Sequence, residues 1–155
     1  MKNVGVIEDA TVEFSPGLNV ITGETGAGKT MVLTALSIVL GGKSEGERIR
    51  SGSERLSVAA RFSLPSKAGE ELAGLLEEHD PEIEDGELLL SRSVTRDGKS
   101  RAHLAGASAS ASLLSDFGRE LLEIHGQHDD RALAGVARHR RRVYPARSHR
   151  SRSYT

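Results

Sequence analysis

Hydrophobic and polar positions alternate along residues 56–64, which predicts a strand with one buried face. Residues 88–94 and 101–104 also look like strands, and they are joined around Asp97-Gly98, a pair typical of hairpin turns. We therefore expect one strand at 56–64 and a two-stranded hairpin after it.

Two further strands are predicted near the N-terminus. Ala10, Val12 and Phe14 alternate with polar residues, and the Ser-Pro-Gly sequence at 15–17 is a turn signal that ends this strand. Residues 18–22 are more apolar, which indicates a second, more deeply buried strand.

A three- to four-residue hydrophobic period predicts helices in three places. The first begins at Thr30 and continues to Leu40, where Gly41-Gly42 is a typical stop signal. The same period appears over 68–79 and, more briefly, over 113–117. Helices and strands together predict an α/β protein.

The chain has 155 residues, which suits a single domain, and it contains no cysteine. Its longest near-apolar run, 31–40, is shorter than the ~18 to 20 residues that a membrane span requires. The N-terminus lacks the apolar stretch of a secretory signal. We therefore predict a cytoplasmic protein with no membrane partner.

Charge divides the chain into two parts. Residues 1–130 contain all 22 acidic residues but 13 of the lysines and arginines, whereas residues 131–155 contain 8 arginines and no acid. The second part has no hydrophobic period and cannot bury a core. We therefore predict a folded domain at 1–130 and a basic tail at 131–155. Three interpretations of the tail remain open: a basic arm that binds nucleic acid, a disordered end, or an out-of-frame stretch.

A phosphate-loop motif lies between the predicted strand at 18–22 and the first helix. It fits G-x-x-x-x-G-K-[ST] with Gly23, Glu24, Thr25, Gly26, Ala27, Gly28, Lys29 and Thr30. Glycines let backbone N–H groups approach phosphate oxygens, and the helix N-terminus attracts the same anion. We expect Lys29 to reach the β- and γ-phosphates and Thr30 to ligate Mg²⁺. The motif alone does not distinguish hydrolysis, phosphoryl transfer and mechanical coupling.

Other chemistry-bearing residues give weaker signals. The segment 125–130 contains two histidines and two aspartates, too few and too loosely spaced to specify zinc without cysteine. Glu24 and Glu123 have no second residue that supports a role as general base.

Four stretches in order resemble one family. They are "VGVIEDATVEFSPGLNVITGETGAGKTMVLTALSIVLGG", "RIRSGSE", "SRSVTRDGKSRAHLAG" and "LLEIHGQHD". Together they resemble the N-terminal half-head of the RecN family, bacterial DNA double-strand-break repair ATPases of the SMC and ABC-type group. The resemblance spans nearly all of residues 3–130.

The resemblance implies a P-loop NTPase fold: the N-terminal half of an ABC/SMC-type head, with an antiparallel β subdomain and an incomplete sheet. It implies that residues 23–30 bind ATP and Mg²⁺. It also places Gln127 at the Q-loop, where an amide contacts the metal or the attacking water; the alternative is an ordinary loop glutamine. Arginines 48, 50, 92 and 101 could touch phosphate or DNA in such heads, or could be solvated surface residues.

In the family pattern a coiled coil and a C-terminal half-head follow, with the LSGG-type signature, the Walker B acids and the switch histidine. This sequence contains none of these. The resemblance therefore implies an ATP-binding fragment of a DNA repair and recombination ATPase, truncated or frameshifted and not hydrolytically competent alone. Its partners would be DNA and a missing C-terminal half-head or second head. The protein would be located in the cytoplasm, associated with the nucleoid. We expect an unpaired sheet edge and an exposed apolar face that favour aggregation or pairing.

Two alternatives remain open. One is another P-loop motor or kinase, because "ITGETGAGKT" also resembles the myosin phosphate loop, although "FSPGLN" and "EIHGQHD" argue against it. The other is a non-enzymatic DNA-binding module that uses the arginine-rich tail.

Overall fold

The computed structural model describes residues 1–22, 27–43 and 46–122. Contacts divide the chain into two units, Met1–Glu123 and Ile124–Thr155. The description below concerns the first unit, and the domain boundary at residue 130 stays a prediction.

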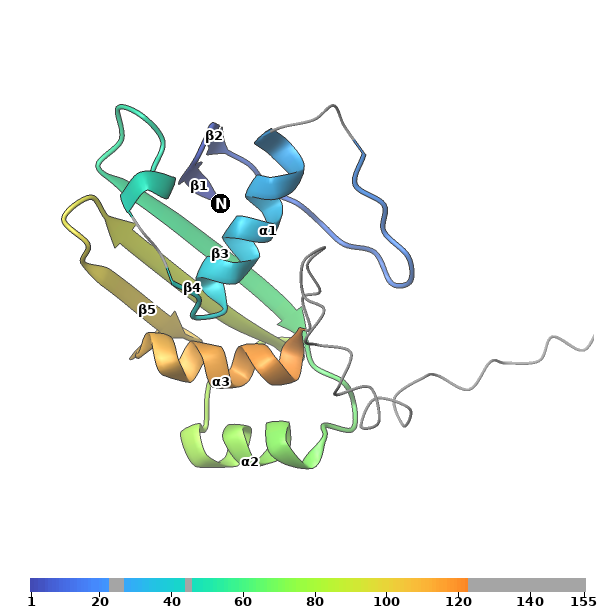
Figure 1. Ribbon diagram of the computed structural model, residues 1–155. Helices are drawn as coiled ribbons and strands as arrows, with labels where there is room; N and C mark the ends of the chain where they lie inside the picture. Colours follow the sequence, from blue (N-terminus) through green and yellow to red (C-terminus); the bar gives the residue numbers. More distant parts are fainter. Residues whose placement is uncertain (23–26, 44–45, 123–155) are drawn as a thin grey trace, which may run out of the picture. The chain divides into compact units, whose positions relative to one another are not determined.

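The described residues form one antiparallel sheet with the strand order β2-β1-β3-β4-β5-β6 (Figure 1). Its strands are β1 (Lys2–Val4), β2 (Ile7–Asp9), β3 (Arg55–Ser63), β4 (Glu87–Thr95), β5 (Ser100–Leu104) and β6 (Ala107–Ala109). The longest ladder joins β3 to β4, from the pair Arg55↔Thr95 to the pair Ser63↔Glu87. The predicted strand at 56–64 and the predicted hairpin after it are confirmed.

The helices are α1 (Ala27–Val39), α2 (Glu70–His79) and α3 (Ala111–Leu121), with a short 3-10 helix, η1 (Gly46–Arg48). All three predicted helices are confirmed, and α1 begins three residues before Thr30. Helices α1 and α3 lie on the same face of the sheet, and α2 packs against α3 (Figure 1). Within the described residues, no helix is long and apolar enough to cross a bilayer.

One face of the sheet is buried because hydrophobic residues occupy alternate strand positions. On β4 the inward positions include Leu88, Leu90 and Val94, all essentially inaccessible to solvent. The helices contribute the facing side chains, namely Ala35, Ile38, Val39, Leu114 and Phe117. An antiparallel sheet can leave its second face in water, and the outward positions here are mostly polar.

The β1–β2 hairpin was not predicted. It turns through Gly5-Val6, and Gly5 has φ +56°. Glycine at the first position of a two-residue loop is typical of a type II′ hairpin turn, so this signal was present in the sequence. A Cβ atom at Gly5 would also collide with the sulfur of Met31. The absence of a side chain at Gly5 therefore lets the hairpin lie close to α1.

The two strands predicted at 10–14 and 18–22 are wrong: residues 11–22 form no strand. The turn between them is confirmed, since the Asn19 side chain accepts from Ser15 N–H at 3.0 Å and donates to Ser15 O at 2.6 Å. A strand needs a neighbour for its backbone N–H and C=O groups, and the described residues offer this segment none.

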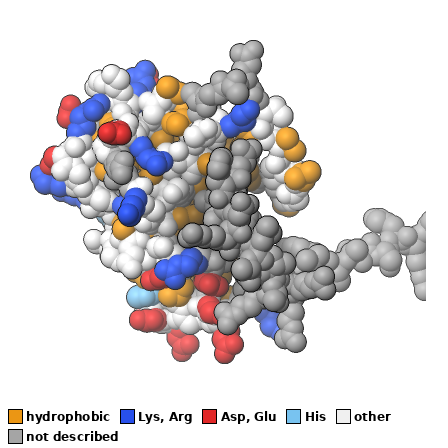
Figure 2. Space-filling model, in the orientation of Figure 1, with side chains coloured by type: hydrophobic (Ala, Val, Ile, Leu, Met, Phe, Trp, Pro, Cys, Tyr) orange, Lys and Arg blue, Asp and Glu red, His pale blue; other side chains and the backbone are white. Residues whose placement is uncertain are grey.

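The same segment exposes hydrophobic side chains. Leu18 is 92% exposed and Val20 is 71% exposed, and Figure 2 shows hydrophobic side chains gathered on the connection between β2 and α1. The apolar surface expected from the sequence is therefore present, on an unpaired segment rather than on the sheet.

Candidate nucleotide-binding site

The end of the phosphate-loop motif forms the first turn of α1. Gly28, Lys29 and Thr30 lie in this turn and are exposed. Residues 23–26, the first half of the motif, lie outside the described residues. The structure thus places the lysine and the threonine of the motif at a helix N-terminus, as expected.

The electrostatics of this helix end suit an anion. The N–H groups of a first helical turn have no partner within the helix and carry a partial positive charge. The first turn of α1 contains no acidic residue to oppose this charge. Phosphate oxygens could accept from these N–H groups beside the ammonium group of Lys29.

Gly28 gives a test of whether a phosphate group fits. A Cβ atom built on Gly28 would meet nothing within 4 Å, and its φ is not positive. Neither packing within the described residues nor backbone conformation therefore requires glycine here. Open space above the backbone at the first turn is what a bound phosphate group needs.

The opposite end of α1 is fixed by a Schellman motif. Gly42 N–H donates to Ser37 O at 2.8 Å, and Gly41 N–H donates to Ile38 O at 3.2 Å. Gly41 has φ +82°, and a Cβ atom there would collide with the backbone of Ala111 in α3. Glycine is therefore required at Gly41 for two independent reasons.

Arg92 reinforces this end of the helix from the sheet. From an inward position on β4, its Nη1 donates to Ile38 O at 3.1 Å and to Gly42 O at 2.6 Å. Its Nε donates to Ser100 Oγ at 2.9 Å. A cation that satisfies the last carbonyls of a helix also interacts favourably with the helix dipole. Burial lowers the pKa of Arg92.

Both sequence-based suggestions for Arg92, a phosphate or DNA contact and a solvated surface residue, are wrong. The residue is buried, and its guanidinium faces the core. The signal was its place in the alternating pattern of β4, at an inward position between Leu90 and Val94.

The other arginines singled out in the sequence do not converge on the first turn of α1. Arg48 donates from Nη1 to Thr34 Oγ1 at 3.4 Å, in the middle of α1. Arg50 pairs with Glu8 at 3.5 Å. Arg101 is exposed on β5.

Several sequence-based predictions fall outside the described residues. They concern Gln127, Glu24, Glu123 and the segment 125–130. Within the described ranges, no group of three or more His, Cys, Asp or Glu side chains could hold a metal ion. The Q-loop role of Gln127 stays a prediction.

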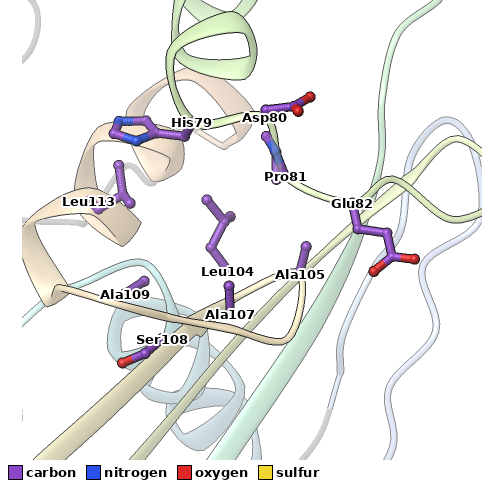
Figure 3. A pocket seen from close by; sticks show the side chains of 10 residues that line it. All are labelled: His79, Asp80, Pro81, Glu82, Leu104, Ala105, Ala107, Ser108, Ala109 and Leu113. Carbon is purple, nitrogen blue, oxygen red and sulfur yellow. The ribbon is translucent and has the colours of Figure 1, made fainter.

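A cleft of about 340 Å³ lies away from α1, between the end of α2 and the β5–β6 hairpin (Figure 3). Leu104 and Leu113 form its apolar part, and His79, Asp80 and Glu82 its polar part. None of its lining residues belongs to α1, so it is separate from the candidate nucleotide site.

The sheet, the helix that follows the phosphate loop and the open first turn together define a P-loop NTPase head. Residues 1–129 match the AAA domain family, and the chain belongs to this family. A solved structure from a study of ATP-driven dimerization and DNA-stimulated activation of SMC ATPases is similar, with a TM-score of 0.64 at 23% sequence identity. The match covers 89% of this chain and 91% of that chain, and it shows an SMC-type head fold.

Among curated proteins, the chain resembles DNA repair protein RecN. It is 44% identical over 140 residues to RecN of Streptomyces coelicolor, covering 90% of this chain and 24% of that protein. It is also 44% identical over 133 residues to RecN of Mycobacterium leprae, covering 83% of this chain and 23% of that protein. The resemblance to RecN is thus confirmed, and the chain spans about a quarter of the length of these relatives.

Proposed function

We propose that this chain is the ATP-binding N-terminal half-head of a RecN-like ATPase of DNA double-strand-break repair and recombination. The observation that carries the proposal is the first turn of α1, where Lys29 and Thr30 follow a glycine with open space above it. The resemblance to RecN supports the assignment to DNA repair. We place the protein in the cytoplasm, with the nucleoid.

The proposed ligand is ATP with Mg²⁺, held by residues 23–30. Lys29 binds the β- and γ-phosphates as a mobile point charge, and the Thr30 hydroxyl provides a hard oxygen ligand for the metal. Gln127 is the proposed further ligand of the metal or of the attacking water. Bound Mg²⁺ would neutralise phosphate charge and so assist transfer of the γ-phosphoryl group.

We propose that this chain alone binds ATP without hydrolysing it. Hydrolysis in this class needs a carboxylate beside the metal and the attacking water. The sequence shows no apolar strand that ends in two acidic residues. Turnover would then depend on a C-terminal half-head or a second head.

The exposed apolar segment supports such a partner. Leu18, Val20 and Ile21 precede the phosphate loop directly, and Leu33 is exposed on α1. Their burial against a second polypeptide would remove apolar surface from water and give the unpaired backbone of 18–22 a neighbouring strand. DNA is the proposed partner of the assembled protein.

Calorimetric titration of the purified 155-residue chain with Mg-ATP, combined with a phosphate-release assay, tests the proposal. We expect binding without turnover, and Lys29→Ala should weaken binding about 10- to 100-fold, because a charged hydrogen-bond partner of phosphate is lost. Lys43→Ala removes the same charge beyond the other end of α1 and should leave the affinity unchanged.

Two results would contradict the proposal. Equal affinities of Lys29→Ala and the unaltered chain would show that the phosphate loop does not bind the nucleotide. Steady phosphate release that depends on Lys29 would show that the chain is a complete ATPase.

A further inference from the structure

The cleft between the end of α2 and the β5–β6 hairpin combines an apolar part with an acidic rim (Figure 3). Leu104 and Leu113 form the apolar part, and β6 contributes only small side chains beside them. Asp80 and Glu82 lie along the rim, on the segment that follows α2. The volume of about 340 Å³ is small for a ligand pocket, so the cleft suits one long side chain better than a large molecule.

The carboxylates at the rim have no partner within the described residues. The side chains of Asp80 and Glu82 are exposed, and they make no hydrogen bond or ion pair there. Asp80 also caps the C-terminus of α2 with a left-handed backbone, φ +39°, where glycine or asparagine is usual. A carboxylate at this end of a helix is repelled by the helix dipole. A bound cation would offset this repulsion.

The electrostatic surroundings of the cleft favour a cation over an anion. The segment 70–87 contains nine acidic residues and no lysine or arginine, and Figure 2 shows acidic side chains gathered over α2. Charges of one sign around a cleft raise the local concentration of the opposite charge. A lysine or arginine side chain can bury its methylene stem against the apolar part while its charged head stays at the rim.

Strand β6 borders the same cleft and has a free edge, because no strand of the described sheet lies beyond it. Ala105 and Gly106 join it to β5 as a two-residue loop with positive φ at both residues, +48° and +83°, as in a type I′ turn. The hydrogen bond of this turn joins Leu104 to Ala107, and bonded and non-bonded pairs alternate along an antiparallel ladder. Ser108 therefore belongs to a non-bonded pair, and its backbone N–H and C=O groups face the free edge.

We propose that this edge and this cleft bind an extended, basic segment of a partner protein. The segment pairs with β6 as an added strand, and one of its lysine or arginine side chains occupies the cleft beside Asp80 and Glu82. Backbone hydrogen bonds to the strand edge provide affinity, and a pocket for an alternate side chain provides specificity. None of the lining residues belongs to the phosphate loop, so the inference does not depend on the proposed nucleotide site.

Fluorescence anisotropy of the full 155-residue chain with labelled seven-residue peptides tests the proposal. The peptides alternate threonine with valine, and only the central residue differs: lysine, methionine or glutamate. We expect the lysine peptide to bind about 3- to 30-fold more tightly than the methionine peptide, because two partly exposed ion pairs form. The glutamate peptide should bind most weakly. Equal affinity for the three peptides would overturn the proposal.

Asp80→Asn/Glu82→Gln should abolish the preference for lysine and leave the affinity for the methionine peptide unchanged. Asparagine tolerates the left-handed backbone of Asp80, so this variant should fold. Glu84→Gln/Asp85→Asn is the matched control, since it removes the same charge from residues of the acidic segment that do not line the cleft. It should weaken binding of the lysine peptide by less than about twofold, because exposed charges are screened. Equal losses in the two double variants would overturn the proposal in favour of general charge.

Ser108→Pro tests the added strand. Proline removes an N–H group that the ladder with β5 does not use, and sheet edges tolerate it. Binding of the lysine peptide should weaken about 2- to 10-fold, as expected for one lost hydrogen bond. Ser108→Ala keeps the N–H group and should bind normally. Equal affinities of Ser108→Pro and Ser108→Ala would overturn the proposal.

Modified peptides test strand pairing without any change to the protein, and they decide the question if Ser108→Pro does not fold. Two lysine peptides are compared, one N-methylated on the backbone of its odd residues and the other on that of its even residues. Only one of these sets faces β6 in a given pairing, so one peptide should lose binding and the other should keep most of it. Binding that neither methylation pattern weakens would overturn the proposal.

Discussion

Gly41 and Arg92 show that the position of α1 depends on single residues far from its phosphate-binding end. Gly41 lets the chain leave the helix in a left-handed conformation against α3, and Arg92 joins the last carbonyls of the helix to β4. Because both act at the C-terminus of α1, they hold the helix whose first turn contains Lys29.

Gly41→Ala should destabilise the protein more than Gly98→Ala, although both glycines have φ +82°. The left-handed conformation costs each alanine about 1–2 kcal/mol. In Gly41→Ala the new Cβ atom also collides with the backbone of α3, which adds ~1–3 kcal/mol to the cost. In Gly98→Ala the new Cβ atom meets nothing within 4 Å. Urea unfolding of the two variants measures the difference, and equal midpoints would contradict the collision.

At the scale of residues, the sequence predicts the positions of side chains that belong to a motif of fixed spacing. Lys29 and Thr30 follow from the phosphate-loop spacing, and the structure places both at a helix N-terminus. The role of Arg92 could not be predicted from its charge, because its partners are carbonyls 54 and 50 residues away, brought near by the β4–α1 packing. That Arg92 faces the core was visible in the strand alternation.

At the scale of elements, hydrophobic periodicity predicted the longer strands and the helices, whereas the three-residue strands β1, β2 and β6 were missed although their neighbours lie in the described chain. Strands β3, β4 and β5 and the three helices were predicted because each buries one face against another. The prediction failed over 10–22, where hydrophobic alternation is present but no strand lies alongside. Hydrophobic periodicity indicates which side chains favour burial. Strand formation also requires a neighbouring strand that bonds the backbone N–H and C=O groups.

The β4–β5 turn has a pH dependence that belongs to this scale. The pKa of Asp97 is lowered by its hydrogen bonds to Lys99, 2.6 Å away, and to the Thr95 hydroxyl. A lowered folded-state pKa contributes stability above the unfolded-state value of about 3.9, and the contribution disappears as the pH falls through the folded-state pKa. Asp97→Asn should therefore reduce stability slightly at neutral pH and flatten the acid limb of the stability curve.

Urea unfolding across the acid range checks this expectation, with Lys99→Met as the matched variant that removes the first partner of Asp97. In Lys99→Met the pKa of Asp97 should rise toward its ordinary value. An acid limb that is identical in Asp97→Asn and in the unaltered chain would show that the turn carboxylate does not contribute.

At the scale of the whole described unit, three surfaces differ in chemistry. The segment 70–87 is acidic, the outward side of β3 and β5 carries the exposed Arg55, Arg61 and Arg101, and the connection between β2 and α1 is apolar. Large apolar patches on soluble proteins mark interaction sites or aggregation sites. The apolar connection directly precedes the proposed nucleotide site, so association there would affect its immediate surroundings.

Leu18→Ser/Val20→Ser should reduce self-association of the chain, because 92% of Leu18 and 71% of Val20 are in contact with water. Sedimentation velocity at increasing protein concentration measures the effect. Ile83→Ser is the control, since Ile83 is an exposed hydrophobic residue in the acidic segment. A monomeric unaltered chain at all concentrations would contradict the prediction.

The connections between paired strands have consequences for folding kinetics. Strand β4 pairs with β5 across the short turn 96–99, but it pairs with β3 across the connection 64–86, which contains α2. Strand β1 pairs with β3 across an even longer stretch. Closing a long loop costs more conformational entropy, so we expect the local hairpins β1–β2, β4–β5 and β5–β6 to form first, β3 to join β4 next, and the β1–β2 hairpin to join β3 last. The hairpin that the ribosome delivers first would then be the last to join the sheet.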